Sequence, residues 1–585
     1  MTTMAGGCHM NNRTGEVRSD GGEKAVRWAF WIIGITAAAV ATYTTRHFIN
    51  GDAINYIEMG EALRYGQWWD LVNLTESPGY AILLGLGQVL LATSRANEVP
   101  LLKWVNFACL IFAMWTCDLL VQFLKHQYST VRRNGVGTLP WSVITAVCYS
   151  MFLFCALNWV RPRLVAPEMI VFSLVLLSVS VVVWIKEDPE PYFKFIILGV
   201  IAGVSYIYKT FFLPFSLVYF VLAGLSSRSL RVAAPRILAA AGVMLIIGAP
   251  LVVSLSLKAG RFSYGEAGNL TRKIYVGQRG KSINAPIRLV EMPEVLLYRD
   301  TPFVNSTRPA AFDPGYWTEG IEPVTDVPKH VRLFVIHLWQ VLSDCPWLAL
   351  GLFIWVGWNL KRRTLHLRHI SEISTPLLFG GIAIAGIVLY CTVHVEMRYL
   401  APFLFLLVLG LVLWPKYVAQ DRRVVLRASV GLSALSLLLL GLMIGSVVDQ
   451  SWRSLSSTTQ KPSYREAYFH MVAVKDFLAA RGIGSGADVA VVGFPPVYWG
   501  RLANLRIIAE IPKKQELLGT TPQNRMKAIA ALRSVGVNTV VGKGAGFGKL
   551  AREGWERVPG TRDYFVRIGR DKTTGRGKKA LSGDT

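Results

Sequence analysis

The sequence is poor in charged residues. Only 17% of its 585 residues are Asp, Glu, Lys or Arg, while 52% are hydrophobic. A soluble domain carries about 25% charged residues. Apolar runs close to the length of a bilayer span recur between Trp28 and Val447. This composition argues against a string of soluble domains and predicts a polytopic α-helical membrane protein.

Paired cysteines, a signal-peptide cleavage site and internal repeats are also lacking. Seven cysteines are present, but none forms a CxxC pair, which argues against a zinc site or a disulfide framework. No convincing small-residue cleavage site follows the first apolar segment, so we expect that segment to remain as a span. Transporters are usually built from internal repeats, so their absence disfavours a transporter.

Charge of one sign dominates, since the formal net charge is +25. The Lys and Arg residues are not pooled in one domain, which disfavours a nucleic-acid-binding protein. Most lie in short loops between apolar runs, the pattern typical of cytoplasmic loops. Placing those loops inside puts the N-terminus in the cytoplasm and predicts about eleven spans: Ala25–Tyr43, Leu101–Leu124, Leu139–Leu157, Ala166–Ile185, Phe193–Tyr208, Phe211–Leu225, Ile237–Leu257, Trp347–Leu360, Thr375–Thr392, Tyr399–Trp414 and Val424–Val448.

The same topology divides the chain into regions. We expect a disordered cytoplasmic tail at 1–24 and a transmembrane domain at 25–448, with outer loops at 44–100 and 258–346. Alternating helical and strand patterns predict a small extracytoplasmic α/β domain at 449–570, followed by a basic disordered tail at 571–585. Within that domain we expect helices at Tyr464–Ala480 and Arg525–Val535, and strands at Asp488–Val492, Arg506–Ile511 and Asn538–Val541.

The first outer loop contains the carboxylates Asp52 and Glu76. Asp52 directly precedes a helical pattern, so its side chain could cap that helix, or it could act as a general base; the two roles are compatible. For Glu76, the alternative to a functional role is that of a solvated loop carboxylate. The helix after Asp52 is predicted to be amphipathic and to lie along the membrane surface, with Glu58 and Glu61 on its polar side. Pro78–Thr93 is likewise predicted to lie on the outer surface.

Charged residues also gather at the predicted outer ends of later spans. Arg161, Arg163 and Glu168 lie between two spans, and Lys209 ends another. Ionisable residues at membrane depth are costly and mark a pathway or a pair. An internal Arg–Glu pair, or arginines that extend to lipid headgroups, are the alternatives for the first three. Lys209 is placed to hold a phosphate as a point charge.

A very short outer loop contains His394, Glu396 and Arg398. A guanidinium can bind a phosphate bidentately, which makes Arg398 a candidate phosphate ligand. His394 and Glu396, together with Glu76, are candidate ligands of a divalent metal ion, the only cofactor that the sequence indicates.

Several of these motifs resemble those of GT-C glycosyltransferases. The order Asp52-x-x-x-Tyr56, Gly66 and Pro78 is similar to the first loop of the bacterial branch that contains protein O-mannosyltransferases and the lipid A aminoarabinose transferase. The stretch Gly199–Lys209 and the motif Glu396-x-Arg398-Tyr399 look like further signatures. The resemblance extends over most of the chain.

This resemblance implies an inverting transfer of a hexosyl or pentosyl group from a polyprenyl-phosphate donor to a glycan, lipid or protein acceptor. It also implies a location in the bacterial inner (plasma) membrane. Asp52 matches the catalytic carboxylate, with Glu168 and Glu76 as further acids. Lys209 and Arg398, with Arg161 and Arg163, then correspond to donor-phosphate ligands.

The chain departs from the family pattern at two positions. Gly79 follows Pro78 where many members have a second proline, and Ala53 follows Asp52 where the mannosyltransferases have an Asp-Glu pair. The resemblance therefore does not extend to protein mannosylation. A transporter or flippase of a lipid-linked saccharide is the alternative function, and a non-catalytic scaffold is a third.

Overall fold

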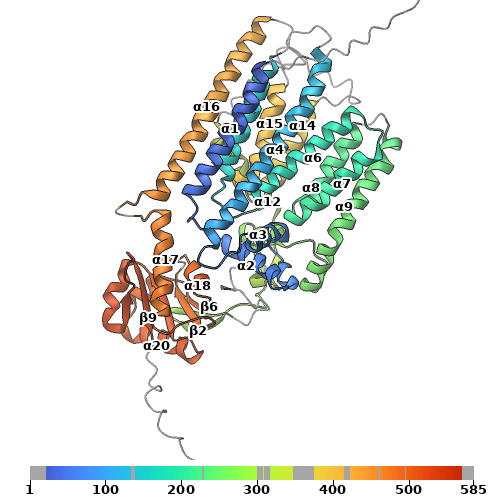
Figure 1. Cartoon of the computed structure of the whole chain (residues 1–585). Coiled ribbons are helices and arrows are strands. Elements are labelled where there is room, and N and C mark those ends of the chain that lie inside the picture. The colour runs from blue at the N-terminus through green and yellow to red at the C-terminus, as the bar shows by residue number, and fades with distance from the viewer. Residues whose placement is uncertain are drawn as a thin grey trace, which may run out of the picture.

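The structure, a computed structural model, has two parts: a bundle of long helices and a sheet domain at one end of it (Figure 1). It describes residues 21–132, 139–226, 229–298, 307–308, 316–346, 375–413, 422–458, 461–493 and 496–569. The predicted span Trp347–Leu360 and the basic tail 571–585 lie outside the described residues, as does most of the predicted N-terminal tail.

The bundle confirms the predicted polytopic helical fold. Six helices are long and apolar enough to cross a membrane, and shorter apolar helices complete the bundle. The long ones are α1 (Gly21–Thr44), α4 (Glu98–Arg132), α5 (Trp141–Phe154) with its π-helical extension η2 (Cys155–Val160), α6 (Glu168–Glu187), α9 (Leu230–Ala259) and α16 (Arg422–Leu455). The shorter ones that match predicted spans are α7 (Tyr192–Tyr208), α8 (Phe212–Leu225), α14 (Thr375–Cys391) and α15 (Met397–Leu413). The chain is an integral membrane protein.

The helices differ in how much of their surface other helices cover. The apolar part of α6 is 89% buried, whereas the corresponding parts of α9 and α16 are 22% buried. Large apolar side chains such as Ile246 and Leu437 therefore point outward, 74% and 71% exposed. Contiguous apolar surface of this kind suits contact with lipid chains. Thus α6 forms the interior of the bundle, and α9 and α16 form parts of its lipid-facing wall.

Two short helices close the end of the bundle beside the sheet domain. These are α2 (Ala53–Arg64) and α3 (Pro78–Leu90). The short helix η1 (Trp68–Leu71) lies between them in the sequence. The helices cross at two glycines: a Cβ on Gly60 would lie 2.9 Å from the backbone nitrogen of Gly85. Only residues without a side chain permit so close an approach.

The prediction that α2 is amphipathic and lies along the membrane surface is wrong. Ten of its twelve residues are buried, Glu58 and Glu61 among them. A buried carboxylate must be paired or hydrogen-bonded. The helix is instead enclosed between α3, the bundle and the sheet domain (Figure 1).

The long outer loop contains regular structure of its own. It forms α10 (Ala267–Tyr275), a short ladder of β1 (Gln278–Arg279) with β4 (Glu322–Pro323), the turn η3 (Tyr316–Thr318) and α12 (Val327–Asp344). Its hairpin of β2 (Ile287–Glu291) and β3 (Glu294–Leu297) pairs with a strand of the C-terminal domain. The outer loop and the C-terminal domain therefore share one sheet, which the sequence did not predict.

The sheet has the strand order β2-β3-β6-β5-β7-β9-β8. Its centre is the parallel group β6 (Arg506–Ile511), β5 (Asp488–Val492) and β7 (Thr539–Lys543), and these are the predicted strands. Antiparallel strands β9 (Tyr564–Ile568) and β8 (Trp555–Arg557) complete one edge. The accompanying helices are α17 (Tyr464–Ala479), α18 (Tyr498–Leu502), α19 (Lys514–Gly519), α20 (Pro522–Ser534) and η5 (Ala545–Glu553).

A buried ion cluster joins the sheet domain to the bundle. Arg501 of α18 is fully buried and contacts Glu98 of α4 at 2.7 Å and Glu61 of α2 at 3.0 Å. Tyr498 donates a hydrogen bond to Glu98 at 2.9 Å, and Arg95 pairs with Glu61 at 3.1 Å. Burial alone would raise the pKa of Glu61, but the charges of Arg501 and Arg95 outweigh it and leave that pKa below its ordinary value.

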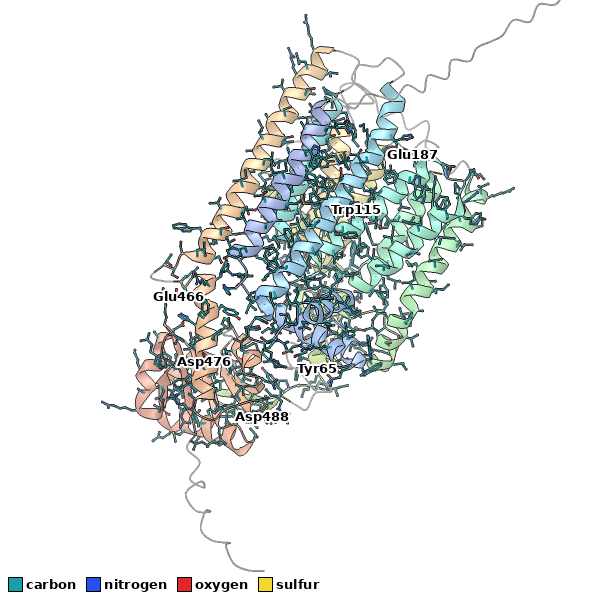
Figure 2. All side chains as sticks on the ribbon, viewed as in Figure 1. Tyr65, Trp115, Glu187, Glu466, Asp476 and Asp488 are labelled. Carbon is teal, nitrogen blue, oxygen red and sulfur yellow. The ribbon has the colours of Figure 1, made fainter. Side chains whose placement is uncertain are left out.

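Charged side chains mark the two ends of the molecule in Figure 2. Glu187 lies at the end of the bundle away from the sheet domain, and Trp115 lies midway along it. Glu466, Asp476 and Asp488 lie on the sheet domain at the other end. The polar loops before α2 and α3 open toward this second end, where the candidate site is found.

Candidate active site

The predicted outer-loop residues meet at the end of the bundle that carries the sheet domain. Asp52 precedes α2, Glu76 precedes α3, Glu168 begins α6, Lys209 follows α7, and Arg398 lies in the first turn of α15. Ion pairs join four of these five residues in two pairs. Most of the predicted catalytic and phosphate-binding residues therefore form one polar cluster.

The side chain of Asp52 does not cap α2. Its backbone is at the N-cap position, but its carboxylate makes no capping hydrogen bond. Instead, Oδ2 lies 3.8 Å from Nη2 of Arg398, and the side chain is 51% exposed. The capping alternative is therefore wrong, and the carboxylate is available at the surface of the cluster.

The protein raises the pKa of Asp52 above its ordinary value. The main cause is loss of solvent around the carboxylate, which Arg398 opposes by attracting the charged form. The neighbouring carboxylates of Glu168 and Glu396 raise it further. A raised pKa makes a carboxylate a stronger base, which is the property needed to accept a proton from a hydroxyl group.

Arg398 connects Asp52 to the turn between α14 and α15. Its Nε lies 2.6 Å from Glu396, and its Nη2 donates to the hydroxyl of Tyr399 at 3.1 Å. Only 14% of the Arg398 side chain is exposed, against 41% of that of Glu396. The guanidinium is thus fixed from one side while its contact with Asp52 is longer and more open.

Glu168 and Lys209 form the second ion pair of the cluster, at 3.3 Å. Glu168 is 6% exposed, and among the described residues its Oε2 has no hydrogen-bond partner. The partner of Glu168 is Lys209, so the predicted alternative of an internal pair with Arg161 or Arg163 is wrong. A buried carboxylate oxygen without a partner is costly, which is typical of a functional group.

Aromatic rings hold the ammonium group of Lys209 in place. Its Nζ lies 4.0 Å from the centre of the Tyr399 ring and 5.9 Å from that of Tyr390. Aromatic faces attract cations, with energies of about 0.5–2 kcal/mol. The ring of Tyr399 is also 5.0 Å from the guanidinium of Arg398, so this one side chain organises both cations.

Glu76 is not a solvated loop carboxylate, which corrects that alternative. It is partly buried, and the hydroxyl of Tyr56 donates a hydrogen bond to it. Burial raises the pKa of Glu76 to about 7, the Tyr56 hydrogen bond opposes this shift, and the charge of Asp52 adds to it. The Asp-x-x-x-Tyr spacing therefore connects the two outer-loop acids through one turn of α2.

The long outer loop covers the cluster on one side. The hydroxyl of Tyr206, near the end of α7, donates to the backbone of Tyr264 at 2.9 Å. The backbone nitrogen of Glu266 donates to the carbonyl of Leu74 at 2.7 Å, just before Glu76. The segment 262–268 thus packs against two of the site's supporting segments.

The predicted metal ligands do not assemble. His394 lies 3.4 Å from Glu396 and stacks on Tyr275 with ring centres 5.0 Å apart, while Glu76 is engaged by Tyr56. The described residues contain no group of three or more His, Cys, Asp or Glu side chains that could hold a metal ion. These residues therefore do not fit a metal site.

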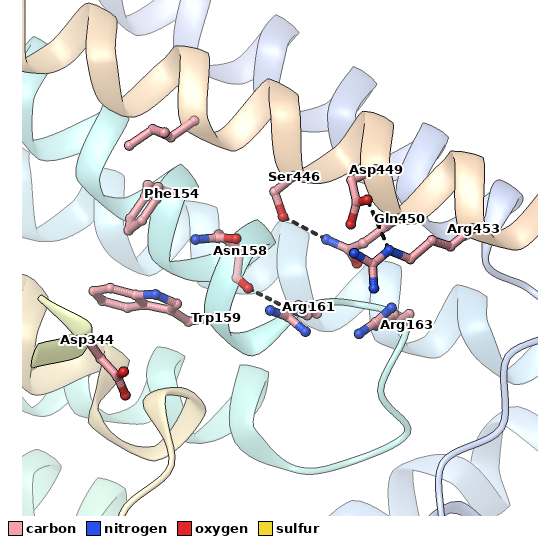
Figure 3. A pocket seen from close by; sticks show the side chains of 11 residues that line it. Phe154, Asn158, Trp159, Arg161, Arg163, Asp344, Ser446, Asp449, Gln450 and Arg453 are labelled. Carbon is pink, nitrogen blue, oxygen red and sulfur yellow. Dashed lines mark hydrogen bonds and ion pairs between the residues drawn. The ribbon is translucent and has the colours of Figure 1, made fainter. Parts of the chain in front are cut away.

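Arg161 and Arg163 lie in a different place from the other phosphate-ligand candidates. They line a separate cavity between the loop after η2 and α16 (Figure 3). Neither Lys209 nor Arg398 is among the described residues that line it. The structure thus separates the four predicted phosphate-binding cations into two groups.

Two contributors to the site were not predicted as such. Tyr399 supports both cations, and Tyr56 binds Glu76. Both tyrosines belong to short motifs that contain predicted residues; for Tyr399, its place at the end of a predicted span was a further signal. The Arg501 cluster had none, because its partners are 440 residues apart in the sequence.

Comparison with known proteins identifies solved structures of similar fold. No family model and no curated protein matches the sequence. Two solved structures of ArnT from Cupriavidus metallidurans, one in the apo state and one bound to undecaprenyl phosphate, align with TM-scores of 0.50 and 0.51. They are 13% and 12% identical, and the alignments cover 93% and 92% of this chain and 98% and 97% of those.

The chain has the GT-C fold. The resemblance expected from short motifs is therefore confirmed for the architecture as a whole. Within this fold, the Asp52–Arg398 and Glu168–Lys209 pairs form the polar cluster at the end of the bundle, and the sheet domain stands beside it (Figure 1).

Proposed function

We propose that this protein is a membrane glycosyltransferase. It moves a sugar from a polyprenyl-phosphate donor to an acceptor on the extracytoplasmic side of a bacterial inner membrane, with inversion. The sheet domain and the polar cluster lie on that side, as the basic inner loops predict. The GT-C fold, shared with a transferase structure bound to undecaprenyl phosphate, supports this assignment.

The observation that carries the proposal is the state of the Asp52 side chain. It begins a buried helix without capping it, it is half exposed, and a guanidinium lies 3.8 Å away. A carboxylate that does not serve the helix and has a raised pKa has the properties of a general base. Asp52 takes that role.

The proposed reaction is a single displacement at the anomeric carbon. The acceptor hydroxyl attacks that carbon and gives its proton to Asp52, while the bond between carbon and phosphate oxygen breaks with its electron pair going to the phosphate. Lys209 and Arg398 bind the phosphate and stabilise the charge that develops on it. Arg398 supplies a planar fork and Lys209 a compact charge.

Glu168 and Glu396 keep those two cations in place before the donor arrives. Each already pairs with its cation at 3.3 Å and 2.6 Å. A phosphate that binds Lys209 would compete with Glu168, whose second oxygen has no partner among the described residues. Glu76, through Tyr56, supports the start of α2 and with it the position of Asp52.

The test is a transfer assay with purified protein and a panel of polyprenyl-phosphate sugars. The expected result is release of polyprenyl phosphate from at least one donor by the wild type, and loss of that release in Asp52→Asn. Asp70→Asn makes the same chemical change in the same outer loop, within η1, and should retain release. Absence of release with every donor would favour the transporter alternative.

A further inference from the structure

A second cationic site lies apart from the catalytic cluster. It is a cavity of about 470 Å³ lined by Arg161, Arg163 and Arg453 together with Phe154, Asn158, Trp159, Asp344, Leu442, Ser446, Asp449 and Gln450. The three arginines gather at one side of the cavity, and Phe154 and Trp159 lie at the other (Figure 3). The cavity therefore has a cationic end and an aromatic end, where the carboxylate of Asp344 also lies.

Two of these arginines form no close ion pair with a described residue. Arg453 pairs with Asp449 at 3.0 Å, but Arg161 and Arg163 form no ion pair with any described carboxylate. Arg161 donates to the carbonyl of Asn158 at 2.5 Å, and Arg163 donates to the hydroxyl of Tyr464 at 2.9 Å. In the catalytic cluster, by contrast, each cation already has a carboxylate.

Both guanidiniums are nevertheless held in position. Arg161 has φ = +63°, a left-handed conformation that is uncommon and costly for residues other than glycine. The guanidinium of Arg163 packs 5.0 Å from the ring of Phe48, and its Nε is buried without a hydrogen-bond partner among the described residues. Guanidiniums fixed in the wall of a cavity are placed to bind an anion.

The charges of the neighbours also favour an anion. Burial is the main cause that lowers the pKa of Arg161 below its ordinary value, and the charges of Arg163 and Arg453 add to this shift while Tyr464 and Asp449 oppose it. A negatively charged group between these side chains would relieve the repulsion. Asp344, the second carboxylate of the lining, lies beside Trp159 on the side away from the arginines (Figure 3).

Helix α16, part of the lipid-facing wall of the bundle, lines the cavity through Leu442, which is 48% exposed. Leu438, one turn earlier on the same face of α16, is 58% exposed. An amphipathic molecule can therefore place its charged group at the arginines and its hydrocarbon chain along α16.

We propose that this cavity binds the phosphate headgroup of an anionic membrane lipid, with Arg161 and Arg163 on the phosphate. It is distinct from the donor-phosphate site at Lys209 and Arg398. Its two phosphate-binding arginines belong to the loop 161–167, which ends at Glu168 of the catalytic cluster. The side-chain amide of Asn50, two residues before Asp52, holds this same loop: its oxygen accepts from the backbone nitrogen of Val165 at 2.9 Å, and its nitrogen donates to the carbonyl of Val165 at 3.3 Å.

The experiment measures lipid binding to the detergent-purified full chain by native mass spectrometry. The probes are phosphatidylglycerol, phosphatidylcholine and glycerol 1-phosphate. We expect the wild type to bind phosphatidylglycerol most tightly. Removing both guanidiniums in the Arg161→Ala/Arg163→Ala variant should weaken that binding by about tenfold or more, because hydrogen bonds to charged groups are strong.

The matched control is Arg46→Ala/Arg465→Ala, which removes the same charge outside the cavity and should bind phosphatidylglycerol as the wild type does. Leu442→Trp provides a second test at an exposed position. It should fill the part of the cavity beside α16 and weaken phosphatidylglycerol binding, and it should leave the helix folded.

Three results would overturn the proposal. One is retention of phosphatidylglycerol affinity in the Arg161→Ala/Arg163→Ala variant. Another is equal binding of glycerol 1-phosphate and phosphatidylglycerol, which would indicate a site for free phosphate. The third is unchanged phosphatidylglycerol binding by Leu442→Trp, which would assign the lipid to another surface.

Discussion

Helix α2 takes part in two ion clusters that contain the same residue types but differ in how exposed they are. At its start, Asp52 meets Arg398; further along, Glu58 and Glu61 meet Arg501. The Arg501 side chain is completely buried, and its glutamate partners are at most 8% exposed. In the first cluster, by contrast, the carboxylate is 51% exposed.

The difference in enclosure separates a structural cluster from the cluster that we propose to be reactive. Arg501 uses its nitrogens on nearby carboxylates: Nε and Nη2 contact Glu98 at 2.7 and 2.8 Å, and Nη1 contacts Glu61 at 3.0 Å. No substrate can reach these groups. At the Asp52 end, the two charged groups lie 3.8 Å apart and the Asp52 side chain is half exposed. A substrate can therefore take the place of either partner.

The sharpest test makes one chemical change at both ends of α2. We expect Asp52→Asn to lower transfer by about 10²–10⁴-fold, the usual contribution of a general base. Glu61→Gln should retain most of the activity but lower the free energy of unfolding by about 1.5–3 kcal/mol, because it weakens hydrogen bonds to two arginines.

Transfer rates and thermal unfolding of both variants provide the comparison. If Asp52→Asn lowered the unfolding temperature as much as Glu61→Gln and left transfer intact, the two clusters would have the same role and the distinction would be lost.

A second prediction concerns the enclosed cluster itself. Arg501→Met should lower the free energy of unfolding by about 3–5 kcal/mol, since it leaves buried carboxylates without their cation. Chemical denaturation in detergent measures the loss. Arg506→Met is the matched control, because Arg506 pairs with Asp488 on the exposed surface, where an ion pair contributes about 0–1 kcal/mol.

A third prediction concerns the open cluster. Lys209→Ala should raise the KM for the donor about tenfold, because one charge-assisted contact to the phosphate is lost. Lys209→Arg should restore much of the affinity, as it keeps the charge. A change confined to kcat, with an unchanged KM in steady-state assays, would remove Lys209 from donor binding.

The last prediction is a pH dependence of stability. The pKa of Glu76 is raised from 4.5 to about 7 in the folded protein, so folding favours its protonated form. Its contribution to stability is therefore full below pH 4.5 and is lost as the pH rises through about 7. Glu76→Gln should remove this part of the decline in unfolding temperature with rising pH. An identical decline in both proteins would contradict the assignment.

Much of the helical fold could be predicted because the bilayer constrains it. A span must be long, apolar and flanked by basic residues on one side, and each requirement is visible in a local window of sequence. The parallel strands β5, β6 and β7 could also be predicted from a local window, because each is a short apolar run. The β2–β3 hairpin was missed because it joins the sheet only through pairing with β6, far along the chain.

The site was predictable as a set of residues, but its pairing was not. Short motifs identified Asp52, Lys209 and Arg398. Whether Asp52 caps its helix depends on a guanidinium that lies far away in sequence, and a local pattern contains no such information. The same holds for Glu58 and Glu61, whose polar spacing indicated a solvated face although Arg501 buries them.

The Arg501 cluster also affects when α2 can pack during synthesis of the protein. The ribosome synthesises Glu58, Glu61 and Glu98 early, and the cation that these side chains share emerges some 400 residues later. Until then Arg95 can pair with Glu61, but closing α2 against the bundle buries Glu58 and Glu98 without their cation. A chain that stops before Arg501 therefore weakens the anchoring of the helix that begins after Asp52, so a shortened copy of the protein would lack the ordered start of its candidate active site.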